Sequence, residues 1–342
     1  MSFAFGFADA DIEAEDGVDN PSSAAASSSN ANLSVLPATE HSLDEFYDTL
    51  PDRLSYSVIR IESPTGKVLL LPRRELYDIR VQLMAEDDTS NDEILNDISA
   101  SDIRSGVYEG GFKTWECSLD LASLLLDRGP RKDIDELVRC DQIVELGAGT
   151  AMPSLVLFQH ALRNDIAITF TLSDYNSAVL RLATLPNLLL TWAAYSDSPL
   201  IDLRSSEGDL EITPDVLQRF KNDLQAKGIV LRLLSGSWSE QLAIMITESA
   251  ADMGNVILAA ETIYSEASTK AFVDLVLTLL RRVKMSKAVV AAKRFYFGVG
   301  GSVDGLKEAC RDGGAVAYEI ENHGVPGMDA GVGRALVEVQ MY

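Results

Sequence analysis

Short apolar stretches alternate with amphipathic stretches over the second half of the chain, from Asp141 onward. The apolar stretches have the length of buried strands, whereas the amphipathic ones repeat with helical spacing. We expect strands within 142–149, 166–174, 228–238, 255–265, 287–297, 315–321 and 334–342. We expect helices at 152–163, 177–195, 214–226, 270–283 and 302–312. Strands separated by crossover helices predict an α/β fold with a mostly parallel sheet covered on both faces.

The first third of the chain has a different pattern. Residues 54–84 contain two β-rich runs around the turn signal SPTGK, which predicts a β-hairpin. An acidic loop follows, from Glu86 to Asp102. Residues 1–45 are acidic and of low complexity, and we expect them to be disordered. The predicted organisation is a tail at 1–45, an extension at 46–104 and a catalytic domain at 105–342.

Net charge narrows the classes of partner. The 342 residues carry a net charge of −23, and 11 acidic residues with no lysine or arginine lie within residues 1–52. Residues 1–52 therefore carry −11 and the remainder −23 − (−11) = −12. Phosphate backbones repel such a chain, so we expect no direct contact with nucleic acid and favour a basic protein partner.

The cysteines and histidines indicate no structural metal or disulfide framework. Three cysteines, an odd number, are typical of a reduced intracellular protein, and no Cys/His group has zinc-ligand spacing. No apolar run is long enough to span a membrane, and the N-terminus lacks the basic region of a secretory signal. We expect a cytoplasmic or nuclear protein, without metal.

The strongest local motif is the strand-to-turn stretch from Ile143 to Ala151, which carries Gly147 and Gly149. A buried strand that ends at glycines before a helix lets the backbone approach a ligand closely. Met152 breaks the G-x-G-x-x-G pattern of a dinucleotide site. Glu145, two residues before the first glycine, can accept a hydrogen bond from an ammonium or hydroxyl group, and S-adenosylmethionine carries both. The alternative interpretation is a tight turn without a ligand.

Further candidates follow the next strands. Asp174 ends the second strand, where an acid can hold ribose hydroxyls or cap the next helix. Trp238 follows the third strand and either contacts an adenine or belongs to the core. Glu261 follows the fourth strand, beside the expected switch point of the sheet. On their residue types alone, Trp115 is a core residue and Cys117 a buried thiol.

Together these motifs resemble a known family. The set GVYEGGFKTWECSLDL, IVELGAGTAMPSL, SDYN with LPN, ETIYS and KRFYFGVGG is similar to that of the protein-histidine N-methyltransferases. These are S-adenosylmethionine-dependent enzymes with seven β-strands. The resemblance covers residues 54–342 and is firm from Ser105 on. It implies a Rossmann-like sheet with strand order 3-2-1-4-5-7-6, preceded here by the β-hairpin extension.

The resemblance also implies roles for individual residues. Those implied to bind or flank S-adenosylmethionine are Trp115, Glu116, Cys117, Glu145, Gly147, Gly149, Asp174, Tyr175, Asn176, Gly236, Ser237, Trp238 and Ala260. Those implied to wall the substrate pocket are Phe295, Tyr296, Phe297 and Gly298. Ala260 departs from the family, in which we expect serine. Glu261 and Tyr264 are candidates for orienting the acceptor imidazole, and no catalytic base is assigned.

The implied reaction is methyl transfer to a histidine nitrogen of a basic protein, expected to be a large-subunit ribosomal protein, by a monomeric enzyme. A neutral imidazole needs no strong base to free its lone pair, because its pKa lies near ~6.5. Two alternatives stay open: a lysine methyltransferase on the same fold, and a cofactor-bound scaffold or chaperone without turnover. A nicotinamide dehydrogenase is disfavoured, because the third fingerprint glycine is absent.

Overall fold

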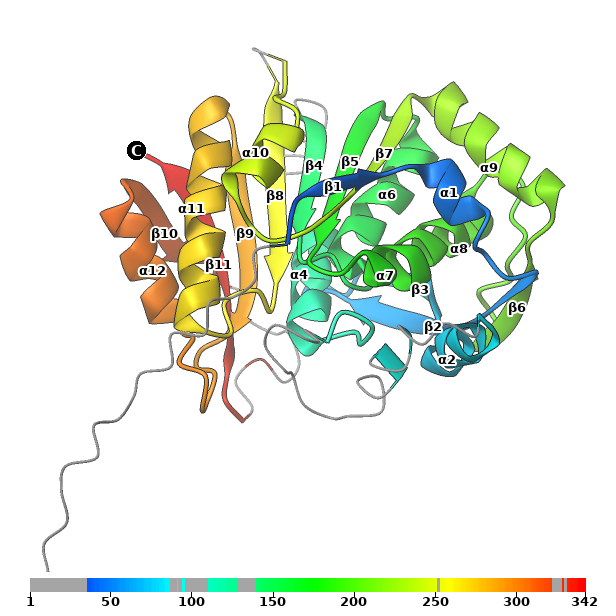
Figure 1. The fold of residues 1–342 in the computed structure, drawn as a ribbon, viewed down its shortest axis with the longest axis horizontal. Coiled ribbons are helices and arrows are strands. Elements are labelled where there is room, and N and C mark those ends of the chain that lie inside the picture. Colours follow the sequence, from blue (N-terminus) through cyan, green and yellow to red (C-terminus); the bar gives the residue numbers. More distant parts are fainter. Residues whose placement is uncertain are drawn as a thin grey trace, which may run out of the picture. The chain divides into compact units, whose positions relative to one another are not determined.

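A mixed eight-stranded β-sheet lies at the centre of the computed structural model, within the part of the chain that the structure describes (Figure 1). The structure describes residues 36–86, 91, 94–95, 110–127, 140–250, 253–321, 328 and 331–342. The predicted tail up to residue 35, most of the acidic loop and the predicted boundary at 104 therefore lie outside the described residues.

The sheet follows the order β1-β7-β5-β4-β8-β9-β11-β10. Its strands are β1 (Thr39–His41), β7 (Ile229–Ser235), β5 (Ile168–Asp174), β4 (Cys140–Leu146), β8 (Gly254–Ala260), β9 (Lys287–Lys293), β11 (Arg334–Met341) and β10 (Ala315–Glu319). The five strands from β7 to β9 are parallel, and β11 is antiparallel to both of its neighbours. Numbered along the chain without β1, the strands from β7 to β10 have the order 3-2-1-4-5-7-6.

Helices cover both faces of this sheet, as the sequence predicts. They are α4 (Glu116–Asp127), α6 (Met152–Asn164), α7 (Ser177–Val179), the π-helix η1 (Leu180–Thr184), α8 (Leu185–Tyr195), α9 (Pro214–Lys227), α10 (Glu240–Met245), α11 (Glu266–Arg282) and α12 (Val303–Asp312). Alternate strand residues enter opposite cores: Ile143 packs with α4, α6 and α8, whereas Val144 packs with α10 and α11. The predicted α/β class, with a mostly parallel sheet covered on both faces, is confirmed.

A second, smaller sheet has the order β3-β2-β6, with β2 (Arg53–Glu62), β3 (Val68–Arg74) and β6 (Glu207–Glu211). The pair β2 and β3 is the predicted hairpin, with Glu62 opposite Val68 at the turn. β6 pairs antiparallel with β2 and was not predicted, because residues 196–227 were expected to contain only the helix at 214–226, which is α9. α2 (Leu76–Ala85) follows β3 directly, so the extended structure expected up to residue 84 was wrong beyond the hairpin.

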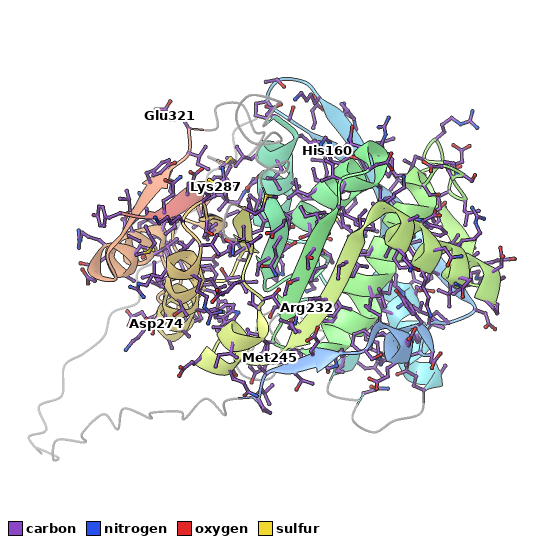
Figure 2. The ribbon with its side chains drawn as sticks, turned by 90° about the horizontal axis from the view of Figure 1, so that it is seen from above. His160, Arg232, Met245, Asp274, Lys287 and Glu321 are labelled. Atoms are coloured by element: carbon purple, nitrogen blue, oxygen red, sulfur yellow. The ribbon has the colours of Figure 1, made fainter. Side chains whose placement is uncertain are left out.

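The predicted tail boundary at residue 45 was wrong, because residues 39–47 form β1 and α1 (Leu43–Tyr47). β1 pairs antiparallel with β7 and makes the sheet eight-stranded rather than seven-stranded. Arg232 of β7 donates hydrogen bonds to both carboxylate oxygens of Glu40 at 2.8 Å and to the carbonyl oxygen of Met245 at 2.9 Å. Figure 2 labels Arg232 and Met245. The His41 Nε2 atom lies 2.7 Å from the Ser235 hydroxyl oxygen. Side-chain contacts thus attach this short strand to the sheet edge.

The packing of α6 against β5 gives a test of the fold. Phe170 of β5 is fully buried and meets Phe158 of α6 edge to face, with ring centroids 5.7 Å apart. Phe170→Ala should lower the free energy of unfolding by about 3–5 kcal/mol, since it removes this contact and leaves a cavity. Urea denaturation measures the loss. Val230→Ala, at a half-exposed position on β7, is the control and should change it by less than about 0.5 kcal/mol. A small loss for Phe170→Ala would contradict tight packing there.

Candidate functional site

The glycine turn, Gly147–Ala151, joins β4 to α6 at the carboxyl end of the parallel strands. Gly147, Gly149 and Ala151 all have left-handed backbone, with φ of 68°, 53° and 59°. A Cβ atom at Gly147 would lie 2.9 Å from Thr262 Cγ2, and one at Gly149 would lie 3.1 Å from the Gly111 carbonyl oxygen. Gly147 and Gly149 therefore each need to be glycine for two reasons: the left-handed backbone and the close packing of neighbouring atoms.

Asp174 ties the end of β5 to this turn. Its carboxylate accepts the N–H of Gly149 at 2.9 Å and the N–H of Asn176 at 3.2 Å. The helix cap proposed from sequence belongs instead to Asn176, whose side chain accepts the N–H of Ala178 at 2.9 Å. Tyr175 lies between them and is partly exposed. The structure therefore brings the acid and the glycines predicted for ligand binding into one site.

Glu145 is buried below the turn. One carboxylate oxygen accepts the backbone N–H of Ser154, in the first turn of α6, at 3.0 Å. Burial is the largest influence on this group, and it raises the pKa of Glu145 to about 8. The carboxylate that the sequence suggested for an ammonium group is thus engaged with the N-terminus of α6.

The loop after β7 carries Gly236, Ser237 and Trp238, predicted to flank an adenine. Ser237 exchanges two hydrogen bonds with Leu36: its N–H donates to the Leu36 carbonyl at 3.1 Å, and its hydroxyl oxygen accepts the Leu36 N–H at 2.9 Å. A Cβ atom at Gly236 would lie 2.6 Å from the Pro37 carbonyl oxygen. Trp238 approaches Gly147 and packs on Phe272, with ring centroids 5.4 Å apart. The segment before β1 therefore covers this loop, and Trp238 is its member nearest the turn.

A segment before α4 reaches the turn from the other side. The Trp115 indole N–H donates to the Gly110 carbonyl at 2.9 Å, and the hydroxyl oxygens of Thr114 and Thr150 lie 3.2 Å apart. Trp115 is partly exposed rather than a core residue, so the interpretation from residue type alone was wrong for it. Cys117 is buried, as expected, and burial raises the pKa of its thiol. Glu116 points to solvent and meets Arg334 at 3.1 Å.

Glu261, directly after β8, has a left-handed backbone with φ of 59°. Non-glycine residues adopt this conformation at a cost of about 1–3 kcal/mol, and such positions cluster at functional sites. Only 7% of its side chain is exposed. Its Oε2 atom accepts the Tyr296 hydroxyl at 2.6 Å, and that hydroxyl oxygen accepts the Lys293 N–H at 3.2 Å. Burial and the nearby Glu261 charge raise the pKa of Tyr296.

We call Glu261, Tyr296, Lys293, Trp115 and Cys117 the Glu261 cluster. The Lys293 ammonium lies 3.8 Å from Glu261 Oε1 and 5.2 Å from the centre of the Trp115 ring. Cys117 lies close enough to Glu261 for that carboxylate to raise the pKa of its thiol further. Residues from α4, β8 and the end of β9 thus meet around one carboxylate.

The predicted substrate wall, Phe295–Gly298, is only partly in this cluster. Tyr296 points to Glu261, whereas Phe295 and Phe297 are 52% and 82% exposed and Gly298 has open space around it. Tyr264 is buried, and its carbonyl oxygen accepts the Gly301 N–H at 3.2 Å. Ala260 is the last residue of β8 and pairs with Ala291 of β9. Of the two proposed orienting residues, Glu261 is the centre of the cluster.

Two buried oxygen atoms on consecutive residues after β8 have no hydrogen-bond partner among the described residues. They are Oε1 of Glu261 and the hydroxyl oxygen of its neighbour Thr262, whose methyl group packs against Gly147. Buried polar atoms are normally hydrogen-bonded, and unpaired ones cost about 1–3 kcal/mol. The pair therefore suits a ligand that carries N–H or O–H donors.

Comparisons with known proteins decide the family. The chain is 37% identical over 276 residues to the Histidine protein methyltransferase 1 of Schizosaccharomyces pombe. The matched region covers 80% of this chain and 76% of that protein. It is 35% identical to the protein of the same name from Saccharomyces cerevisiae, with 89% of each covered. The chain belongs to the histidine protein methyltransferase 1 family. The family resemblance seen in the sequence motifs is thereby confirmed.

More distant relatives also match the chain. A Mus musculus protein named Histidine protein methyltransferase 1 homolog is 29% identical over 241 residues, with 70% of this chain and 59% of that protein covered. No protein-family model matches the chain. The solved DhpI–SAH complex is 11% identical with a TM-score of 0.35, covering 78% of this chain and 94% of that one. A likeness of that size carries no weight beside the curated members of the histidine protein methyltransferase 1 family.

The sequence did not indicate the roles of some residues that the structure places at the site. Lys293 lies in the quoted motif KRFYFGVGG, but its place beside Glu261 depends on the turn after β9. Thr184 and Asn187 bond to the glycine turn, and Asn187 lies in the quoted LPN motif, to which no role was given. The described residues contain no group of three metal-binding side chains and no helix long and apolar enough to cross a membrane.

The pKa of Glu145 generates a prediction about stability. In the folded protein Glu145 keeps its proton up to about pH 8, whereas in the unfolded chain the same group loses its proton above its ordinary pKa of 4.5. The folded state therefore holds one more proton between these pH values, so the contribution of Glu145 to the free energy of unfolding falls as the pH rises from 4.5 to about 8. Glu145→Gln removes this dependence and keeps an acceptor for Ser154. Between pH 5.5 and 7.5, the wild type should lose up to about 1.4 kcal/mol per pH unit relative to the variant.

Urea denaturation of both proteins at several pH values measures this difference. Every other titrating group is common to the two proteins. The difference between their curves of unfolding free energy against pH therefore gives the contribution of Glu145. Parallel curves for the wild type and Glu145→Gln would contradict a raised pKa.

Proposed function

We propose that this protein transfers the methyl group of S-adenosylmethionine to a histidine nitrogen of a basic protein. The observation that carries the proposal is the buried carboxylate of Glu261, with one oxygen held by Tyr296 and the other 3.8 Å from the Lys293 ammonium, beyond hydrogen-bond distance. An imidazole N–H is a donor of the kind that this second oxygen lacks. Membership of the histidine protein methyltransferase 1 family supports the choice of histidine over other acceptors.

S-adenosylmethionine supplies an activated methyl group on a sulfonium ion. The residues that would hold it are Gly147 and Gly149 of the turn, with Asp174 beside them and Trp238 on the adenine side. The turn allows close approach of backbone, and the helix α6 begins directly after it. Because the methyl group is already activated, the protein contributes mainly position and orientation, worth up to about 7–11 kcal/mol.

Glu261 acts on the acceptor ring. When its Oε1 atom accepts the N–H of one imidazole nitrogen, the other nitrogen is left with a free lone pair, so the carboxylate selects the reactive tautomer. Methyl transfer would break the S–CH3 bond of the sulfonium, whose sulfur keeps the electron pair as the thioether of S-adenosylhomocysteine, and would form an N–C bond that gives the ring a positive charge. The carboxylate would stabilise this charge until the ring N–H proton leaves to solvent. Tyr296 fixes the carboxylate by donating to Oε2, while its oxygen accepts the Lys293 N–H.

We propose a histidine of a large-subunit ribosomal protein as the acceptor, methylated by the monomeric enzyme in the cytoplasm or nucleus. Ribosomal proteins are basic, and the net charge of −23 on this chain favours their encounter. The same charge opposes rRNA, so the free ribosomal protein should be a better substrate than the assembled subunit.

The deciding experiment incubates the protein with isotope-labelled S-adenosylmethionine and unassembled large-subunit ribosomal proteins, followed by peptide mass spectrometry. The expected result is one labelled histidine. Label on lysine would support the lysine methyltransferase instead. Binding of S-adenosylhomocysteine without any label on protein would support a non-catalytic scaffold.

The role of Glu261 predicts the effect of Glu261→Gln. The amide would turn a donor toward the imidazole N–H and lose the charge that stabilises the methylated ring. We expect kcat to fall by about 10–100-fold, the value of a hydrogen bond to a charged group, with the Kd of S-adenosylhomocysteine within about threefold of the wild type. Glu266→Gln, on the exposed first turn of α11, is the matched control and should be fully active. Wild-type kcat for Glu261→Gln would refute the assignment.

A further inference from the structure

Two buried side chains hold consecutive carbonyl groups of the glycine turn. The Thr184 hydroxyl donates to the Gly149 carbonyl at 2.7 Å, and the Asn187 amide donates to the Thr150 carbonyl at 3.0 Å. Thr184 is fully buried and Asn187 is 1% exposed. Asp174 accepts the N–H of Gly149, so both the N–H and the carbonyl of Gly149 are held by hydrogen bonds.

The helix that provides these two side chains is irregular at this point. η1 is a π-helical segment, and Pro186 follows it in the first turn of α8. Proline has no N–H, so the carbonyl of Leu182, four residues earlier, loses its usual donor in the helix. π-helical segments are frequent at functional sites. Here the Leu182 carbonyl, in the irregular segment, accepts a donor from another part of the chain.

Arg74, the last residue of β3, supplies that donor. Its guanidinium donates to the Leu182 carbonyl at 3.0 Å, to Gln82 at 2.7 Å and to Asp78 at 2.6 Å. Its backbone N–H donates to Asn187 Oδ1 at 2.8 Å. The Arg74 side chain is fully buried. One residue of the N-terminal extension therefore bonds both the irregular helix and the side chain that holds the turn.

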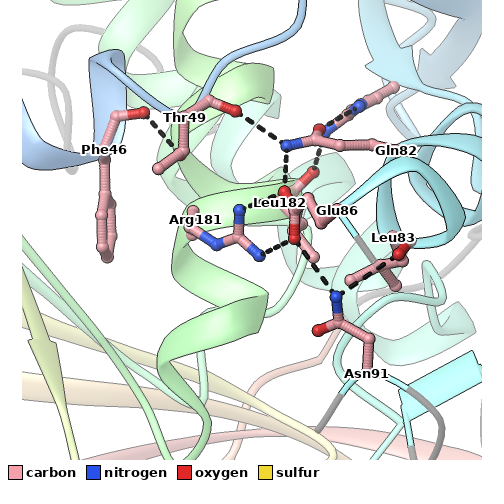
Figure 3. A network of polar contacts seen from close by, with 9 residues as sticks. Phe46, Thr49, Gln82, Leu83, Glu86, Asn91, Arg181 and Leu182 are labelled. Atoms are coloured by element: carbon pink, nitrogen blue, oxygen red, sulfur yellow. Dashed lines mark hydrogen bonds and ion pairs between the residues drawn. The ribbon is translucent and has the colours of Figure 1, made fainter. Parts of the chain in front are cut away.

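Further hydrogen bonds join α2 to the start of the extension and to the π-helix (Figure 3). Gln82 of α2 donates to the Thr49 carbonyl at 2.8 Å and to Glu86 at 2.9 Å. Glu86 pairs with both terminal nitrogens of Arg181 in η1, at 2.6 and 2.9 Å. A continuous set of hydrogen bonds thus runs from the start of the extension to the π-helix.

We propose that Thr184, Asn187 and Arg74 are positioning residues, through which the N-terminal extension holds the glycine turn in the shape that binds the methyl donor. This inference rests on the proposed function, because it takes S-adenosylmethionine as the ligand of the turn. It assigns to the small sheet and α2 a task in cofactor affinity, in addition to packing against the catalytic domain.

A matched pair of substitutions tests the proposal. Thr184→Val keeps the side-chain shape and removes the hydrogen bond to Gly149, whereas Thr191→Val makes the same change seven residues later. Thr191 is equally buried, and its hydroxyl oxygen has no hydrogen-bond partner among the described residues. We expect Thr184→Val to raise the Kd of S-adenosylhomocysteine, measured by calorimetry, by about 5–20-fold, and Thr191→Val to change it less than about twofold.

Kinetics separates positioning from a merely structural role. Thr184→Val should raise the KM for S-adenosylmethionine, while kcat at saturating donor stays within about threefold. A structural defect alone would lower the Tm and the active fraction but would leave the KM of the folded enzyme unchanged. An unchanged Kd and KM in Thr184→Val would overturn the proposal.

A second pair tests the link to the extension. Arg74→Lys keeps the charge beside Asp78, but an ammonium cannot reach the three acceptors that the planar guanidinium serves. It should raise the Kd of S-adenosylhomocysteine several-fold, whereas Arg73→Lys, at the partly exposed neighbouring position, should not. Equal Kd values for Arg74→Lys and Arg73→Lys would overturn the link. Failure of the wild-type protein to bind S-adenosylhomocysteine would instead overturn the proposed function itself.

Discussion

The backbone at Gly149 is the constraint on which the site depends. Its N–H is held by Asp174 from β5, its carbonyl by Thr184 from η1, and its Cα faces the Gly111 carbonyl of the segment before α4. Left-handed φ values at Gly147, Gly149 and Ala151 give the turn a shape that ordinary residues resist. Three separate parts of the chain therefore have to fold correctly before the turn has its final form.

This constraint explains why a costly arrangement is kept nearby. Burying the Arg74 guanidinium requires several partners, because an unpaired charge inside a protein is strongly destabilising. Asp78, Gln82 and the carbonyl freed by Pro186 provide them. Desolvation lowers the pKa of Arg74 and outweighs the opposing effect of Asp78, which shows that burial is the dominant influence on this group. The hairpin sheet is joined to the catalytic domain at the place where its donors are needed.

Most of the fold could be predicted from sequence because the parallel strands are continuous apolar runs that lie between amphipathic helices. The two strands that were missed have no such signal. Thr39–His41 and Glu207–Glu211 are short, polar and at sheet edges, as edge strands commonly are. Their pairing depends on partners far along the chain, such as Thr39 with Ser235, so no local pattern could show it.

The candidate site was predictable in its residue types and less so in their directions. Glu145 and Glu261 both belong to the carboxyl ends of neighbouring parallel strands, and either could serve a ligand on chemical grounds. Glu145 lies within β4, and its carboxylate bonds to the start of α6. Glu261 lies one residue beyond β8 in a left-handed conformation, and its carboxylate meets residues from α4 and β9. The backbone conformation at one residue thus separates an acid engaged with a helix from one available to an acceptor, and residue type alone does not encode that conformation for glutamate.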